Sequence, residues 1–378
     1  RLRIRHAPAR SEKSAERGGS GALFFTIRRI NLEFTHLHVH TEYSLLDGSN
    51  KIKEYVARVK ELGMDSAAIT DHGVMYGVID FYRAAREAGI NPILGCEVYV
   101  APGSRFDREV GSGDDRYYHL VLLAENNQGY SNLMKIVSKA FVEGFYYKPR
   151  VDLELLEKYH EGIIALSACL AGEVARYLAR GMYEDAKIAA LRYQDIFGKG
   201  NFFLELQDHG IPEQQTVNQQ LLRMHRETGI DLVATNDVHY TMAEDAEPHD
   251  VLLCLQTQKK LSDENRMRYE GGQYYVKSPE EMARLFPYAL EALENTHRIA
   301  ERCHVEIEFG VTKLPKYDVP DGFTSWEYLN KLCHEGLEQR YHPVTEELKK
   351  RLDYELSTIK NMGYVDYFLI VWDFIKYA

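Results

Sequence analysis

Histidine recurs at two-residue spacing near the start of the sequence. The stretch FTHLHVHTEYSLLDGSN contains His36, His38 and His40, and Asp47 follows in the same stretch. Successive side chains of a strand point to opposite faces, so these three imidazoles would share one face. Imidazoles that share a face need polar partners, and a metal ion is one such partner. His36 lies deeper along this face, so we expect it to pack there or to support a ligand from behind.

Side chains of the same kinds follow other apolar runs. Asp237 and His239, in ATNDVHY, repeat the two-residue spacing after a run of their own. The remaining examples are Asp71 and His72 in TDHG, Glu97 in GCEVYV, His119 in YYHLVLL and Cys169 in LSAC. His119 fits this pattern less well, because it lies at the start of its apolar run and not after the end. Asp71 reads either as a helix cap or turn residue, or as a carboxylate that supports an imidazole.

The combination of imidazoles, carboxylates and one thiol suits metal binding. Such donors favour zinc, manganese or iron over magnesium or calcium. The nine expected ligands are His38, His40, Asp47, His72, Glu97, His119, Cys169, Asp237 and His239. They are too many for one tetrahedral ion and suit two or three divalent ions. Adjacent ions stabilise the attacking and leaving oxygens of a phosphoryl displacement and lower the pKa of a bound water to about 7. We therefore expect a metal-bound hydroxide, held by these ligands, as the nucleophile.

Seven apolar runs, separated by helical patterns, would position these residues. The expected strands are Phe34–Val39, Ser66–Thr70, Ile93–Val98, Leu120–Ala124, Gly162–Ser167, Phe202–Leu206 and Asp231–Thr235. Between the first two, Ser49 is expected to cap an amphipathic helix that ends before Gly63. Strands that alternate with helices predict an α/β fold with a parallel sheet, either open or closed into a barrel. A barrel gathers functional residues after its strands, and no glycine-rich phosphate loop supports an open nucleotide-binding fold.

The composition limits the class of protein. The chain has 378 residues, of which 45% are hydrophobic, so a large core is available. Five scattered cysteines without a CxxC pair predict a reduced, cytoplasmic protein. The net charge of −11 argues against a protein that binds DNA non-specifically through a basic surface. It allows a nucleic-acid enzyme, because bound cations add positive charge locally. No apolar run approaches the roughly 18 residues of a membrane span, so we expect no membrane partner.

The sequence changes character along the chain. Residues 1–31 are rich in Arg, Ser and Gly, and we expect a disordered leader or an artefact there. Residues 32–307 carry the α/β pattern, and residues 308–325 read as a proline-containing linker. Residues 326–378 are mostly amphipathic helix and end on the apolar FLIVWDFIKYA, which indicates a fragment of a longer protein.

Candidate substrate contacts are fewer. GFYYKPRVD places Lys148 and Arg150 beside two tyrosines, and cations interleaved with aromatic rings suit single-stranded nucleic acid. An exposed loop is the alternative. Tyr43 and Tyr76 lie close in sequence to expected ligands and could border the same cleft. His209, in ELQDHG, could contact substrate or lie in a solvated loop.

These motifs resemble the PHP (polymerase and histidinol phosphatase) superfamily, whose fold is a distorted seven-stranded barrel with a metal cluster. More closely, the chain resembles the N-terminal part of the bacterial replicative DNA polymerase III alpha family. The motifs that carry this resemblance are HLHVHTEYSLLDG, AITDHGVMYG, GCEVYV, GFYYKPRVD, ATNDVHY and the tail ELSTIKNMGYVDYFLIVWDFIKYA. The resemblance runs from about Leu32 to the last residue.

The resemblance implies the same nine metal positions, and each holds a residue able to bind metal. Many members of the family have lost several of them, so the full set implies an active 3′–5′ exonuclease for proofreading. Its implied partners are the primer 3′ end of DNA and other replicase subunits. The carboxylates that catalyse DNA synthesis in this family lie further along the chain and are absent from this sequence. We therefore expect the parent protein, and not this fragment, to synthesise DNA. Two alternatives remain: a small-molecule phosphatase of the histidinol-phosphatase type, and a non-catalytic, metal-stabilised scaffold.

Overall fold

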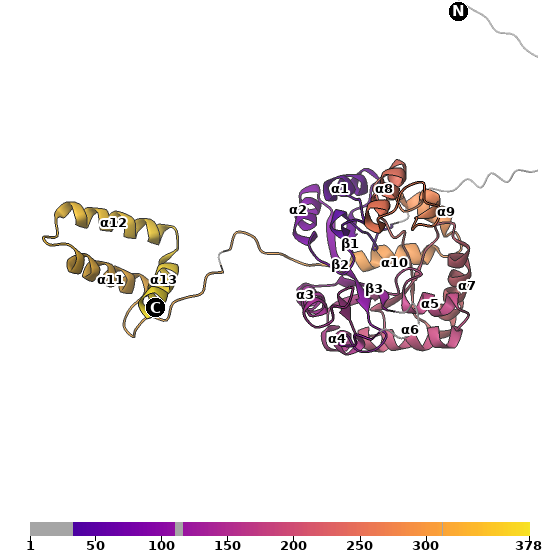
Figure 1. Ribbon diagram of the computed structural model, residues 1–378, viewed down its shortest axis with the longest axis horizontal. Helices are drawn as coiled ribbons and strands as arrows, with labels where there is room; N and C mark the ends of the chain where they lie inside the picture. The colour runs from indigo at the N-terminus through magenta and orange to yellow at the C-terminus, as the bar shows by residue number, and fades with distance from the viewer. Residues whose placement is uncertain (1–32, 110–115, 312) are drawn as a thin grey trace, which may run out of the picture. The chain divides into compact units, whose positions relative to one another are not determined.

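The computed structural model describes residues 33–109, 116–311 and 313–378, which form two compact units (Figure 1). The first, here called the barrel unit, ends at Glu306, and the second, the helical unit, comprises Ile307–Ala378. The expected leader at residues 1–31 lies outside the described residues.

The barrel unit is built on a seven-stranded sheet in the order β1-β2-β3-β5-β6-β7, with β4 beside β2. The strands are β1 (Ser66–Ile69), β2 (Asn91–Val100), β3 (Tyr118–Ala124), β4 (Arg150–Val151), β5 (Ile163–Leu166), β6 (Phe202–Leu206) and β7 (Leu232–Ala234). The α/β class is confirmed, but the sheet is mixed: β3 runs antiparallel to both β2 and β5, whereas the other pairs are parallel. No helix is described between β2 and β3, and a parallel pair needs a long crossover connection that is usually helical.

The chain segment with the first histidines connects the two edges of this sheet. The expected strand at Phe34–Val39 is wrong in detail, because its backbone groups divide between two neighbours and form no regular ladder. On one side His40 N donates to Val238 O at 2.8 Å, and on the other Thr70 N donates to Val39 O at 2.9 Å. The segment therefore lies between β1 and the residues after β7, and the sheet curls into a distorted barrel.

Helices surround the sheet of the barrel unit (Figure 1). They are α1 (Ile52–Glu61), α2 (Val78–Ala88), α3 (Asn127–Val142), α4 (Leu153–Tyr159), α5 (Glu173–Ala179), α6 (Tyr183–Phe197), α7 (Pro212–Thr228), α8 (Ala246–Thr257), α9 (Pro279–Leu285) and α10 (Leu290–Ala300). Three 3-10 turns occupy Glu42–Ser44, Ala243–Asp245 and Glu270–Gly272.

Helix α1 shows how the local sequence shapes these helices. Its buried residues are Ile52, Tyr55, Val56 and Val59, in which Tyr55 and Val56 follow Ile52 by three and four residues and Val59 follows them by four and three, so all face the core. Gly63 follows the helix with φ of 78°, which confirms the expected stop, because glycine adopts positive φ without a steric penalty. The expected cap at Ser49 is wrong: Lys51 occupies the cap position without a side-chain hydrogen bond.

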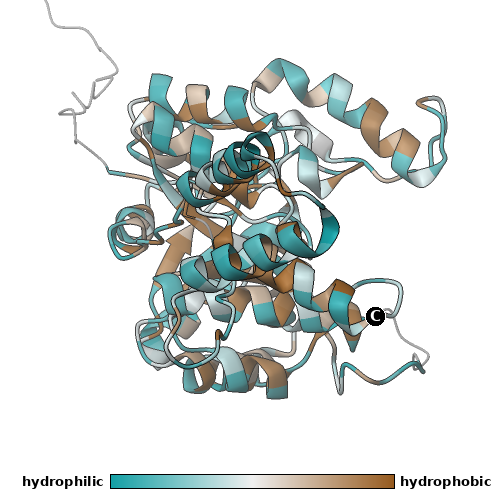
Figure 2. Ribbon diagram, turned by 90° about the vertical axis from the view of Figure 1, so that its left-hand side faces the viewer, coloured by the Kyte–Doolittle hydropathy of each residue, from teal (hydrophilic) through white to brown (hydrophobic). Residues whose placement is uncertain are grey.

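One buried hydrophobic cluster of the barrel unit is formed mainly by side chains from the strands and from the end of α10. It comprises Leu37, Ala68, Ile93, Val121, Leu123, Ile164, Leu166, Ala168, Phe203, Val233, Ile299, Ala300 and Cys303. Figure 2 shows hydrophobic residues gathered on the strands, while the helices around them alternate between hydrophilic and hydrophobic residues. Burial of each large aliphatic side chain contributes roughly 1.5–3 kcal/mol, so this core fixes the strands that carry the polar residues.

The helical unit confirms the expected helical segment near the end of the chain. It consists of α11 (Ser325–Arg340), α12 (Glu346–Asn361) and α13 (Val365–Tyr377). Leu329, Leu356 and Leu369, one from each helix, form its small core. Among the described residues of both units, no helix is long and apolar enough to cross a membrane.

Candidate metal centre

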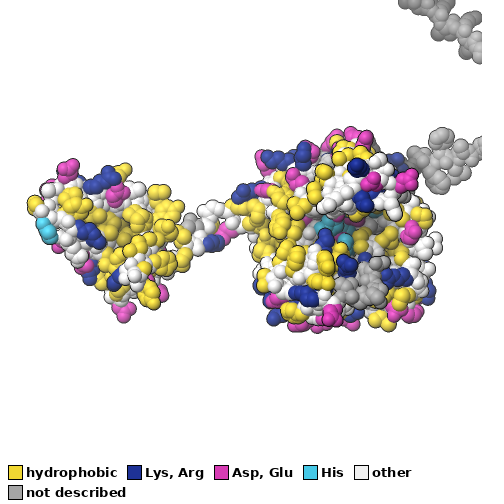
Figure 3. Space-filling view, in the orientation of Figure 1, with side chains coloured by type: hydrophobic (Ala, Val, Ile, Leu, Met, Phe, Trp, Pro, Cys, Tyr) yellow, Lys and Arg dark blue, Asp and Glu magenta, His cyan; other side chains and the backbone are white. Residues whose placement is uncertain are grey.

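A cavity of about 420 Å³ opens at the end of the barrel where the parallel strands finish. Seven of the nine expected ligands line it: Asp47, His72, Glu97, His119, Cys169, Asp237 and His239. The other two, His38 and His40, are completely buried beside them. Figure 3 shows histidine side chains at the bottom of a hollow on the barrel unit, with Lys and Arg side chains around it.

The antiparallel direction of β3 explains the position of His119. Because β3 runs against β2, its first residues lie beside the end of β2, and His119 pairs with Tyr99 across the ladder. His119 Nδ1 lies 2.8 Å from Glu97 Oε1, and Cys169 Sγ lies 3.9 Å from the same nitrogen. The residue that fitted the expected parallel sheet poorly therefore reaches the same site as the others.

Two carboxylates lie at the centre of the cluster. Asp237 Oδ1 lies 3.2 Å from His38 Nε2 and 3.1 Å from His40 Nε2, and Glu97 Oε1 lies 3.3 Å from His38 Nε2. Asp237 has φ of 44°, a left-handed conformation that aspartate tolerates better than most residues. Each carboxylate is thus shared by more than one imidazole.

Several atoms of this cluster lack hydrogen-bond partners in the described part of the protein. They are the Nε2 atoms of His38, His40 and His72 and the Oδ1 atom of Asp237. Buried polar atoms are ordinarily bonded, and leaving one unpaired costs roughly 1–3 kcal/mol. Imidazole nitrogens and carboxylate oxygens that face one another without a hydrogen bond fit a divalent cation, which would satisfy all of them.

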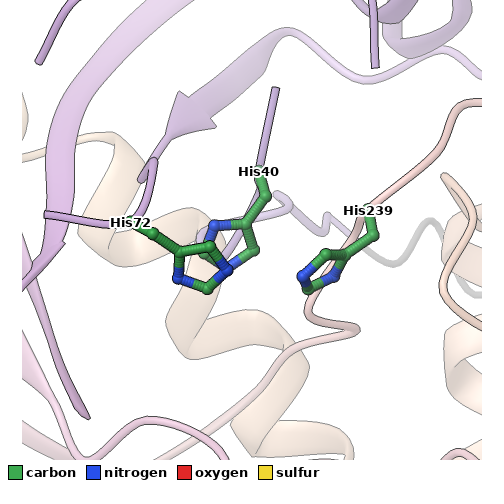
Figure 4. A group of neighbouring side chains, drawn as sticks. All are labelled: His40, His72 and His239. Atoms are coloured by element: carbon green, nitrogen blue, oxygen red, sulfur yellow. The ribbon is translucent and has the colours of Figure 1, made fainter. Parts of the chain in front are cut away.

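Three overlapping groups of side chains could each hold a metal ion. In each group the ligand atoms lie within 4.8 Å of one another. The groups are His40, His72 and His239; His38, His40 and Glu97; and His72, Glu97 and His119. Figure 4 shows the first group, whose imidazoles come from three separate segments and point toward one another. His72 Nε2 also lies 3.2 Å from Asp47 Oδ2, so Asp47 borders this group.

Charge and burial act in opposite directions on these groups. Burial and the neighbouring imidazoles lower the pKa of His40 to about 3, so it is neutral and able to bind metal. Burial alone would lower the pKa of His72, but the carboxylates of Glu97 and Asp47 raise it to about 10. Although burial opposes the effect, nearby histidines hold the pKa of Asp237 below its usual value, so that carboxylate remains charged. Burial raises the pKa of Cys169, whereas metal coordination deprotonates a thiol.

Glu205 is a residue of this site that the sequence analysis missed. Its Oε1 lies 2.7 Å from His38 Nδ1, and both side chains are fully buried. A carboxylate that holds the second nitrogen of a metal-binding imidazole fixes its tautomer and orientation. The signal was available in FFLEL, where a single charge interrupts an apolar strand.

Two residues expected behind the ligands have different roles. Asp71 accepts hydrogen bonds from Thr41 N and Ser44 Oγ, both at 2.6 Å, and so holds the turn after the first histidines. Ser44 Oγ in turn lies 3.4 Å from His40 Nδ1. His36 Nε2 lies 2.8 Å from the carbonyl oxygen of Lys277, away from the cluster, so His36 packs within the fold.

Among the candidate substrate contacts, Lys148 is the one that reaches the cavity. It lines the cavity beside Tyr117, and its Nζ lies 5.2 Å from the centre of the Tyr99 ring. A cation over an aromatic face at a cavity rim can contact phosphate while the neighbouring rings offer stacking surfaces.

The other candidates do not line this cavity. Arg150 is buried and donates to the carbonyl oxygens of Gly144 and Arg105, so its guanidinium is used within the fold. His209 is also buried, so the alternative of a solvated loop is wrong for this residue. Its ring stacks on that of Tyr274, with the ring centres 3.8 Å apart.

Tyr43 and Tyr76 also lie away from the lining. The Tyr43 hydroxyl donates to Asp80 Oδ2 at 2.7 Å and borders a different cavity, between α1 and α2. Tyr76 is 59% exposed. Both tyrosines are close in sequence to expected ligands, but neither ring lines the cavity that contains those ligands.

Two family models match the chain. Residues 36–209 match the PHP domain, and residues 327–378 match the bacterial DNA polymerase III alpha NTPase domain. The structure is also similar to that of an amidohydrolase from Chromobacterium violaceum, with a TM-score of 0.38 and 15% identity over 55% of this chain and 88% of that chain.

Curated relatives match over most of this chain. The DNA polymerase III subunit alpha of Treponema pallidum (strain Nichols) is 49% identical over 92% of this chain and 30% of that protein. That of Helicobacter pylori (strain ATCC 700392 / 26695) is 44% identical over 92% of this chain and 31% of that protein. The chain thus spans about 30% of the length of these relatives. It carries a PHP domain followed by a segment of the bacterial DNA polymerase III alpha NTPase domain.

Proposed function

We propose that the barrel unit is a metal-dependent phosphoesterase that hydrolyses the terminal phosphodiester at the 3′ end of DNA. In this role it removes misincorporated nucleotides as a 3′–5′ proofreading exonuclease. The observation that carries the proposal is the convergence of imidazoles and carboxylates whose buried facing atoms lack hydrogen bonds in the described structure. Two or three ions of zinc, manganese or iron suit this donor set.

Each residue of the cluster has a defined part in the proposal. The metal ligands are the nine residues His38, His40, Asp47, His72, Glu97, His119, Cys169, Asp237 and His239. When bound, divalent ions supply Lewis acidity to the phosphoryl oxygens and lower the pKa of a water. Glu97 and Asp237 each face more than one imidazole, so each carboxylate would hold a metal ion together with those imidazoles. Lys148 contacts the phosphate backbone at the rim, and Tyr117 offers a stacking surface for a base.

We further propose that the whole protein is a cytoplasmic, replicative DNA-directed DNA polymerase. In this proposal residues 32–307 form the phosphoesterase domain, residues 308–325 form a linker, and residues 326–378 lead into the polymerase module. The primer 3′ end and other replicase subunits are its partners. The support is the matching of both segments to polymerase III alpha relatives, of which this chain covers about 30%.

The experiment combines metal analysis with a nuclease assay. The purified chain is loaded with manganese or zinc, its metal content is measured by mass spectrometry, and it is incubated with 5′-labelled single-stranded DNA. We expect stepwise shortening from the 3′ end, which is lost in His38→Ala and Asp237→Asn. His160→Ala, an exposed histidine away from the cavity, is the matched control and should retain activity.

The same experiment separates the proposal from its two rivals. A folded, metal-loaded wild type that leaves DNA intact contradicts the exonuclease. Turnover of a phosphomonoester in preference to DNA would identify a small-molecule phosphatase. A chelator that lowers the melting temperature of a protein without nuclease activity would identify a metal-stabilised scaffold.

A further inference from the structure

The phenol of Tyr269 reaches the metal centre from outside the barrel strands. Tyr269 lies in the connection between α8 and α9, and its side chain lines the cavity. Its hydroxyl lies 3.1 Å from His239 Nε2 and 3.3 Å from Asp47 Oδ1. Both neighbours are proposed ligands, yet the proposed function assigns Tyr269 no role.

The surrounding aromatic side chains hold this phenol in place. Its ring stacks on His249, with ring centres 5.1 Å apart, and contacts Tyr274 at 4.6 Å. His249 is itself fixed, because its Nε2 lies 2.6 Å from the carbonyl oxygen of Asp47. A tyrosine side chain has few rotatable bonds, so a ring clamped on two sides presents its hydroxyl at a defined point.

The hydrogen bonds of His239 and Asp47 define what the hydroxyl does there. His239 Nδ1 lies 2.7 Å from the carbonyl oxygen of Asp237, which can only accept, so Nδ1 carries the proton. The Tyr269 hydroxyl lies between His239 Nε2 and Asp47 Oδ1, and it donates its single proton to the carboxylate oxygen, which can only accept. The lone pair of Asp47 Oδ1 that accepts this proton cannot bind a cation at the same time.

We propose that Tyr269 positions the substrate: its hydroxyl donates to Asp47 in the free protein and to a phosphate oxygen of the bound substrate. The inference rests on the proposed function for the identity of that substrate, a single-stranded DNA end. Binding of a cation by Asp47 would free the hydroxyl from this hydrogen bond, while the stacked ring would keep the hydroxyl at the cavity. A phosphodiester in the cavity supplies an anionic oxygen, to which hydrogen bonds are stronger than to neutral acceptors.

The test uses Tyr269→Phe, which keeps the stacked ring and removes only the hydroxyl. Because a competitor for the Asp47 oxygen is lost, manganese measured by calorimetry should bind about fivefold more tightly, the factor expected for one hydrogen bond. A nuclease-resistant single-stranded oligonucleotide should bind the metal-loaded variant about tenfold more weakly. A merely structural phenol would not raise metal affinity while lowering affinity for DNA.

The matched control is Tyr275→Phe, whose hydroxyl donates to Glu281 and does not line the cavity. Both of its affinities should equal those of the wild type. Unchanged or weakened metal binding in Tyr269→Phe, or unchanged DNA binding, would overturn the role of Tyr269. These outcomes differ from failure of the proposed function, in which the wild type itself binds no metal or cuts no DNA.

Discussion

The Glu205 carboxylate lies 2.7 Å from His38 Nδ1, and neither side chain is exposed to solvent. The same carboxylate accepts hydrogen bonds from Gln207 Nε2 and Thr235 Oγ1. These partners hold Glu205 in one orientation, and Glu205 in turn directs His38 Nε2 toward Glu97 and Asp237. Burying a charged carboxylate costs several kcal/mol of desolvation free energy. Stability alone therefore does not account for Glu205 at this position, and its contact with His38 does.

Glu205→Gln should weaken metal binding without removing a ligand. The amide keeps the size of the side chain but loses the charge that holds the His38 proton, so we expect about 10- to 100-fold lower metal affinity. Calorimetric titration with manganese or zinc measures the effect. Glu227→Gln, which alters ion pairs with Lys187 and Arg223 on the surface, is the control. Equal metal affinities in the two variants would refute this role of Glu205.

Removal of metal should lower the melting temperature of the barrel unit. A ligand at 100 times its dissociation constant stabilises the folded state by about 2.7 kcal/mol. For a unit of this size that corresponds to a decrease of roughly 5 °C on chelation, for each ion lost. Differential scanning fluorimetry with and without EDTA measures it. The melting temperature of Asp237→Asn should fall less on addition of EDTA than that of the wild type. A wild type whose melting temperature is the same with and without EDTA would contradict metal binding.

Local patterns in the sequence predicted the elements that depend on neighbouring residues. The amphipathic pattern before Gly63 coincides with α1, and the stop at Gly63 follows from its positive φ. The two-residue spacing of His38 and His40 brought both imidazoles to one site because side chains alternate along extended backbone. His36 lies two residues earlier in the same segment, and its ring bonds to the carbonyl oxygen of Lys277 instead of reaching the cluster.

Features that depend on distant partners could not be predicted in this way. The direction of β3 is set by its pairing with β2 and β5, which no local pattern in Tyr118–Ala124 encodes. Arg150 follows two tyrosines and a lysine in sequence, yet it is buried against backbone carbonyls. A run of cationic and aromatic residues predicts a nucleic-acid contact only if those residues are exposed. Whether they are exposed depends on the tertiary fold, which the local sequence does not show.

Lys277 should make stability depend on pH in the alkaline range. Its side chain is only 2% exposed, and burial lowers its pKa to about 8, although Glu281 and Asp208 oppose this. The unfolded chain has a lysine pKa of about 10.4, so between about pH 8 and 10.4 it holds more protons than the folded protein. The free energy of unfolding should therefore rise with pH across this window.

Chemical denaturation at several pH values in this window, compared with Lys277→Met, measures this effect. The comparison cancels the titration of the tyrosines, which both proteins share. The wild type should gain stability relative to the variant as the pH rises. Parallel pH profiles for the two proteins would show that Lys277 retains its ordinary pKa.

Lys148→Gln should weaken binding of single-stranded DNA and reduce its dependence on salt. Lys148 lines the metal cavity beside the rings of Tyr99 and Tyr117, where a backbone phosphate can displace its counterion. Loss of one such contact on a single strand should reduce the slope of log affinity against log salt concentration by about 0.7. Fluorescence anisotropy with a nuclease-resistant oligonucleotide at several salt concentrations measures both quantities. Lys53→Gln removes the same charge from a residue of a different cavity, so it should leave the slope unchanged. Equal slopes for the wild type and Lys148→Gln would show that the strand follows another route to the metal centre.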